Sequence, residues 1–146
     1  MIKLNYAAIA TGASIDNASG NVTLFNIIED IRIPKDRMPV AIPELAFVGS
    51  FTRLEPNIQN MDFKLEYLQP NGKNILINKS TTVFQGERMR VVIRLNGMPI
   101  EGFGRHKIRV SWNWKAGSND EDTEGSFDIF LDAVEFEMPA PQQLPN

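Results

Sequence analysis

The sequence predicts an all-β protein, an antiparallel β-sandwich of about seven to nine strands. Three observations predict it. Apolar and polar residues alternate with period two along much of the chain, turn-forming residues recur at short intervals, and no window carries the apolar stripe of an amphipathic helix. We expect a sandwich that is immunoglobulin-like in the broad sense, with a β-barrel as the alternative.

Three segments give the clearest strands, because one face of each is apolar and the other is charged or polar. They are Met61–Tyr67, Met89–Leu95 and Ile108–Trp114. Five more candidates are rich in Val, Ile and Phe and are bounded by turn residues: Leu4–Ala10, Val22–Ile33, Leu45–Leu54, Asn74–Ile77 and Phe127–Phe136. Eight strands are therefore expected.

Turn chemistry separates these segments. Reversals are expected at Asn17–Gly20, at Gln69–Gly72 and at Asn96–Gly97, where the residues tolerate positive φ or preset a turn. Gly102–Gly104 is read as the turn into the strand that carries His106. The segment Pro34–Pro43 is too rich in proline for more than one helical turn.

The 146 residues suit one domain, expected to span residues 1–138, followed by a Pro-rich and flexible tail over 139–146. The apolar stretch at the N-terminus is too short and too polar for a signal peptide or a membrane span. We therefore expect a cytoplasmic protein without membrane contact. Zero cysteines exclude disulfides and thiolate nucleophiles, and a single histidine excludes a multi-histidine metal cluster within one chain. No cofactor is expected.

Charge is segregated along the chain, although the formal net charge is only -3. Residues 1–115 hold all 15 Lys and Arg against 10 carboxylates, whereas residues 116–146 hold 8 carboxylates and no basic residue. Most of the positive excess comes from alternate positions on two predicted strands: Arg88, Arg90, Arg94, Lys107, Arg109 and Lys115.

Two interpretations of this segregation stay open. If the two strands adjoin, Arg88, Arg90, Arg94, Lys107 and Arg109 form a cationic face for an anionic or acidic partner. Alternatively the charges pair internally, with Asp128 and Asp132 opposite Lys107, Arg109 or Lys115 in a hairpin. Nucleic acid is not the expected partner, because Trp112 and Trp114 have the opposite parity from the basic residues and read as core.

The acidic loop and the histidine are the remaining candidates. Asp120, Asp122 and Glu124 alternate as calcium ligands can, but the glycine and the distant glutamate of an EF-hand loop are missing, so a solvated loop is the preferred interpretation. No nucleophile or orienting carboxylate is recognisable for His106, and no phosphate-binding or dinucleotide-binding motif occurs.

The N-terminal two thirds resemble a family of small, uncharacterised bacterial single-domain proteins. Five segments over residues 4–95 carry the resemblance: Leu4-Asn-Tyr-Ala-Ala-Ile-Ala10, Gly20-Asn-Val-Thr-Leu-Phe-Asn-Ile-Ile28, Met38-Pro-Val-Ala-Ile-Pro43, Leu45–Phe51 and Gln69-Pro-Asn-Gly72. These motifs are structural, and the resemblance implies a β-sandwich without implying a function. The acidic segment after Lys115 departs from the family's pattern.

The sequence therefore predicts a non-catalytic β-sandwich that binds a protein partner or self-assembles, for instance as a homodimer, using a charged surface. A ligand-binding domain or an enzyme with an unrecognised site is the alternative. The charged strand Arg88–Arg94 also reads as an edge protected against open-ended pairing.

Overall fold

The computed structural model describes residues 1–115, 123–137 and 145. Its strands, in chain order, are β1 (Ile2–Ile15), β2 (Val22–Ile27), β3 (Asp30–Pro34), β4 (Val40–Arg53), β5 (Asn60–Leu68), β6 (Asn74–Val83), β7 (Arg88–Ile100), β8 (Gly104–Trp114) and β9 (Thr123–Phe136), with one 3-10 turn, η1 (Lys35–Arg37), after β3. The segment Pro34–Pro43 thus holds no more than one helical turn, as its prolines predict.

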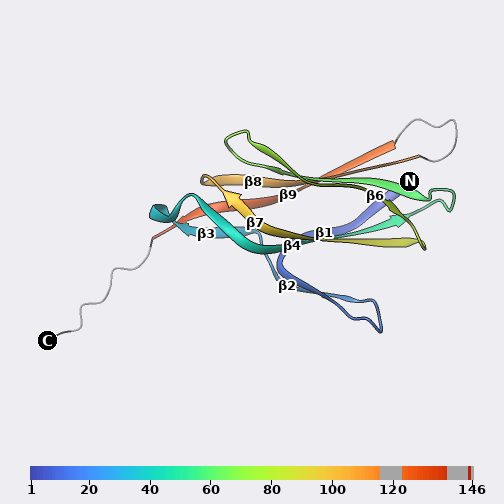
Figure 1. Cartoon of the computed structure of the whole chain (residues 1–146), viewed down its shortest axis with the longest axis horizontal. Coiled ribbons are helices and arrows are strands. Elements are labelled where there is room, and N and C mark those ends of the chain that lie inside the picture. Colours follow the sequence, from blue (N-terminus) through green and yellow to red (C-terminus); the bar gives the residue numbers. More distant parts are fainter. Residues whose placement is uncertain (116–122, 138–144, 146) are drawn as a thin grey trace.

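The strands form two separate sheets that stack as layers (Figure 1). The first sheet has the order β2-β1-β4-β7, and the second has the order β3-β9-β8-β5-β6. This arrangement is the predicted sandwich, whereas the barrel alternative would have joined the strands into one closed sheet. The strand pairs are antiparallel, as predicted, except that β3 runs parallel to β9.

Apolar residues from both sheets fill the space between the layers. Phe51 of β4 packs edge-on against Phe63 of β5 and Trp112 of β8, with ring centroids 6.1 and 5.4 Å apart. All three side chains are buried, and in β5 and β8 the intervening polar residues lie on the outer face. The alternation therefore fixes which face of each strand forms the core.

The predicted strand Val22–Ile33 is two strands in the structure, which raises the count from eight to nine. Asn26 lies at φ 51°, and the chain then passes from one sheet to the other. The backbone N–H of Ile28 still bonds the carbonyl of Ile9 in the first sheet, whereas the carbonyl of Glu29 accepts from Asp132 in the second. Because of the kink, the segment Val22–Ile33 contributes β2 to the first sheet and β3 to the second.

The reversal predicted at Asn96–Gly97 is also wrong, since β7 continues through both residues to Ile100. Gly97 does adopt a positive φ of 67°, but it does so within the strand. The register places it opposite Pro43, between the pairs Ile42–Met98 and Glu44–Asn96. Proline has no N–H to donate to the opposite strand. The distortion at Gly97 therefore falls where one hydrogen bond of the ladder is already missing.

The hairpin of β1 and β2 projects away from the two layers, at the bottom of Figure 1. Its tip is tied back to the first sheet, because Arg90 Nη1 of β7 donates to the carbonyl of Gly20 at 2.6 Å. The expected tail, residues 139–146, lies outside the described residues except for position 145.

Candidate functional site

The outer face of the five-stranded sheet carries a broad hollow with a volume of about 720 Å³. Strands β5, β8 and β9 build it, because their alternate polar residues point away from the core. Its lining is Lys64, Glu66, Arg109, Ser111, Glu124, Gly125, Ser126, Phe127, Asp128 and Phe130. We call this region the polar hollow.

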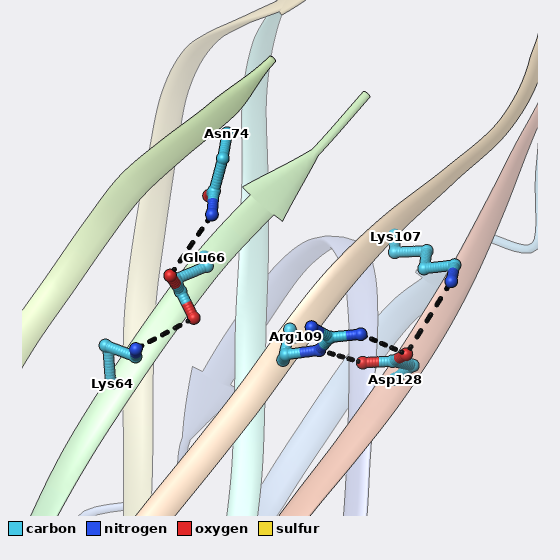
Figure 2. Close-up of polar contacts among 6 residues, drawn as sticks. All are labelled: Lys64, Glu66, Asn74, Lys107, Arg109 and Asp128. Atoms are coloured by element: carbon cyan, nitrogen blue, oxygen red, sulfur yellow. Dashed lines mark hydrogen bonds and ion pairs between the residues drawn. The ribbon is translucent and has the colours of Figure 1, made fainter. Parts of the chain in front are cut away.

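Arg109 and Asp128 form the central ion pair of the polar hollow. They lie directly opposite each other in the β8–β9 ladder. Arg109 donates from Nε to Oδ1 at 2.8 Å and from Nη2 to Oδ2 at 3.0 Å, so the contact is bidentate. Lys107 Nζ lies 4.0 Å from the same Oδ2 (Figure 2). Two cations therefore share one carboxylate.

A second cluster lies beside the first on β5. Lys64 Nζ is 3.1 Å from Glu66 Oε2, and Asn74 of β6 donates to Glu66 Oε1 at 3.3 Å. Glu66 is also the register partner of Arg109. The two clusters in Figure 2 thus form a row of alternating charges across three strands.

Both carboxylates of this row have a lowered pKa. The hydrogen bonds from Arg109 lower the pKa of Asp128, assisted by the charges of Arg109 and Lys107 and opposed by partial burial. Desolvation alone would raise the pKa of Glu66, but the hydrogen bonds from Lys64 and Asn74 and the charges of Lys64 and Arg109 together outweigh it. Both groups are therefore ionised at neutral pH.

Aromatic rings add apolar area next to these charges. Phe130 is 45% exposed, and the guanidinium of Arg105 lies 4.7 Å from its ring centroid. Arg105 also forms a bidentate pair with Asp132, at 3.0 and 3.3 Å. Lys107 Nζ lies 5.8 Å from the same ring. A cation over a ring face is attracted by the ring quadrupole, so these contacts hold Phe130 in place at the surface.

The five residues of the predicted cationic face do not form one surface. Arg88, Arg90 and Arg94 lie on β7 in the four-stranded sheet, whereas Lys107 and Arg109 lie on β8 in the other sheet. The prediction of one cationic face is wrong, because alternation shows that side chains on each strand point outward but does not show which strands are neighbours. Arg94 is paired with Glu44 at 2.9 Å on its own side of the sandwich.

Internal pairing, the other interpretation, describes Asp128 correctly and Asp132 only in part. Asp128 pairs with Arg109 and Lys107 as expected. Asp132 pairs instead with Arg105, which is not among the predicted basic partners. Arg105 has the same parity as Lys107 and Arg109, so extending the alternation by one step would have found it.

The calcium candidate is only partly within the described residues. Asp120 and Asp122 lie outside them, and Glu124 is an exposed residue near the start of β9. Among residues 1–115, 123–137 and 145, no group of three or more His, Cys, Asp or Glu side chains is arranged to hold a metal ion.

His106 of β8 is a buried residue that contacts Tyr67 of the neighbouring strand β5. Its Nδ1 lies 2.7 Å from the hydroxyl of Tyr67 and its Nε2 lies 2.8 Å from the carbonyl of Gly102. Tyr67 links the two sheets, because its hydroxyl donates to the carbonyl of Pro99 on β7 at 2.8 Å. Burial, with a smaller contribution from Glu101, raises the pKa of Tyr67, which keeps the phenol neutral. Trp112 and Trp114 are buried, as their parity predicted.

The fold and the polar hollow define a class, a β-sandwich with mostly antiparallel strands and a polar, charge-paired outer face. A family model described as "Family of unknown function (DUF6941)" matches residues 5–116, and the chain belongs to this family. The resemblance stated from residues 4–95 is thereby confirmed as membership of an uncharacterised family.

No curated protein matches the chain. Among solved structures, the chain is similar to a β-glucosidase from Listeria innocua in complex with glucose, at TM-score 0.46 and 9% identity, over 93% of this chain and 16% of that one. It is also similar to Spo0M, a sporulation control protein from Bacillus subtilis, at TM-score 0.37 and 13% identity, over 87% of this chain and 50% of that one. The chain thus spans half or less of either structure. Within the described residues, no helix has the length and apolar character needed to cross a membrane.

Proposed function

We propose that this protein is a non-catalytic module that binds a protein partner through the polar hollow. The observation that carries the proposal is the row of fixed, alternating charges flanked by exposed aromatic rings on an open sheet face. Protein interfaces combine aromatic and arginine side chains with a polar rim in this way.

The pairing of the charges supports specificity. Arg109 is held in one orientation by Asp128, so a partner meets a pre-ordered pattern and orders few side chains on binding. Complementary charges on the partner would fix its register and raise the association rate at low salt. We also propose a cytoplasmic location, which a chain without cysteine suits.

The ionisation of the hollow supports a binding role over acid–base chemistry. A general acid or base works best with a pKa near the working pH. The pKa of Asp128 and that of Glu66 are shifted away from neutrality by their cationic neighbours. A ligand-binding domain is the second candidate, because a volume of about 720 Å³ lies in the range of small-molecule sites.

Site-specific photocrosslinking tests the proposal. A benzophenone amino acid is placed at Ser111, which lines the polar hollow, and separately at Ser50, a half-buried serine on the outer side of the other sheet. In lysate of the source cells, the Ser111 probe should give one adduct of defined mass that weakens at high salt. The Ser50 probe should give none.

Charge reversal provides the matched pair of variants. Arg109→Glu should reduce the Ser111 adduct at least tenfold, whereas Arg90→Glu, on the opposite face, should leave it unchanged. Equal adducts from both probe positions, or an adduct that survives Arg109→Glu, would rule out the polar hollow as the binding surface.

A further inference from the structure

Strand β9 is only half covered on the side away from β8. It pairs with β8 over Thr123–Ala133 but with β3 only over Asp132–Phe136. No other described strand pairs with residues 123–131 on that side. We call this stretch the open edge of β9.

The open edge follows from the way the chain crosses between the sheets. Strand β2 covers only the far half of β1, from Ala10 to Ile15, before the chain leaves at Ile28 for the second sheet. It then runs as β3 along the last five residues of β9. The crossing segment therefore does not reach residues 123–131.

The side chain of Phe127, next to the open edge, is also exposed. Phe127 is 46% exposed even though Ile129 and Leu131, at the same parity, turn toward the core. A side hollow of about 380 Å³ opens there between the start of β1 and β9, with Phe127 and Trp112 in its lining. An added strand would place alternate side chains against this apolar area.

Three of the four outermost strands are protected in ways that the open edge is not, whereas the fourth, β2, carries no Lys, Arg or Pro but is only six residues long. Strand β7 carries Arg88, Arg90 and Arg94, β6 carries Lys79, and β3 is short and ends in Pro34. Lysine, arginine, proline and short length are common means of blocking strand addition. Residues 123–131 contain no Lys, Arg or Pro.

We infer that a second copy of this chain covers the open edge, by antiparallel pairing of β9 with β9 around a two-fold axis through Phe127. The midpoint of residues 123–131 is residue 127, so this register pairs the full open edge of one copy with that of the other. It sets Phe127 opposite its own copy and buries two exposed rings together.

Repulsion between like charges also favours the register centred on Phe127. Pairing centred on Phe127 places Ser126 opposite Asp128 and Glu124 opposite Phe130 of the other copy. A shift that centres the pairing on Asp128 would set Asp128 against its own copy and Glu124 against Asp132. Like charges directly opposite each other destabilise an antiparallel pair. Phe127 also lines the polar hollow, but the pairing uses the backbone edge of β9, so the inference does not depend on the proposed partner.

The absence of cysteine makes a direct test possible, because any disulfide in a single-cysteine variant must join two chains. Phe127→Cys should oxidise to a covalent dimer under mild oxidant. Phe130→Cys is the matched control: it is on the same strand and equally exposed, but its predicted neighbour is Glu124 of the other copy. Its disulfide should form at least tenfold more slowly.

Sedimentation equilibrium of the unmodified protein gives an independent readout. The wild-type chain should approach twice its mass of 16.4 kDa as concentration rises, and Phe127→Lys should stay monomeric. Phe25→Lys, at an exposed ring on β2, should dimerise as the wild type does. A wild-type monomer at every soluble concentration, or equal oxidation rates for the two cysteine variants, would overturn the inference.

Discussion

At the scale of single residues, Gly125 of β9 packs closely against its register partner, Trp112 of β8. The indole lies over the glycine, so that a Cβ at position 125 would overlap Trp112 Cζ2. The indole Nε1 also donates to the carbonyl of Ile2 at 3.3 Å. The glycine thus leaves the space that lets Trp112 bridge the two sheets.

Gly125→Ala should therefore destabilise the protein by about 1–3 kcal/mol, because the methyl group displaces a ring that cannot move without losing core contacts. Urea unfolding followed by tryptophan fluorescence measures the change. Gly86→Ala is the control, since nothing lies within 4 Å of a Cβ there and φ is not positive. Its effect should be near zero, and an equal loss in both variants would contradict this account.

For the polar residues, alternation along a strand predicts which side chains face outward but not which partners they contact. Parity in the sequence correctly predicted that Trp112 and Trp114 are core and that Arg109 faces outward. It could not show that Arg105 would meet Asp132, because that contact depends on the register between two strands. Register is set by long-range packing and turn geometry, which a single strand does not carry.

At the scale of elements, the crossing between the sheets is the feature that the sequence concealed. The apolar run from Val22 to Ile33 continues through the kink, so periodicity joined β2 and β3 into one strand. One local sign is Asn26 at φ 51°, since asparagine tolerates the left-handed region better than other residues with a side chain, and another is the charged pair Glu29–Asp30 at the start of β3.

This conformation yields a test at position 26. Asn26→Gly should be neutral within about 0.5 kcal/mol, whereas Asn26→Val should cost about 1–2 kcal/mol, because a β-branched residue is strained at positive φ. The measurement is the free energy of unfolding in urea. Asn60→Val, at an exposed strand position on β5 without positive φ, is the control and should change little. A tolerated valine at position 26 would show that the kink is not needed.

At the scale of the whole molecule, the charge segregation of the sequence is resolved partly by strand pairing. Asp128 and Asp132 of the acidic C-terminal third neutralise Arg109 and Arg105 of the basic body. The arginines of β7 remain on the opposite sheet, far from this pairing in the strand order. The positive excess is therefore divided between two faces.

Acid should destabilise the molecule. The pKa values of Asp128, Asp132 and Glu66 are all lowered in the folded state, so the unfolded chain binds more protons at low pH. Their contribution is complete above the usual carboxyl pKa of about 4 and is lost as pH falls through the lower folded values. The free energy of unfolding should stay level from neutral pH down to about pH 5 and then decline.

Asp128→Asn isolates one member of this set. At neutral pH it should cost about 0.5 kcal/mol, as expected for a partly exposed ion pair, and the difference from wild type should shrink as the wild-type carboxylate protonates. Urea unfolding between pH 3 and 8 measures both curves. A constant difference across that range would mean that the carboxylate's charge is not what stabilises the fold.

The sequence by itself determined the fold class, most of the segments that become strands, and the buried face of the regular ones. These properties are local, because a period of two assigns alternate side chains to opposite faces wherever a strand lies. Only the tertiary structure decided which strands are neighbours, and with them the polar hollow, the division of the cationic residues and the open edge of β9. Each of these joins residues far apart in the chain, and which strands pair is settled by burying all the apolar faces together.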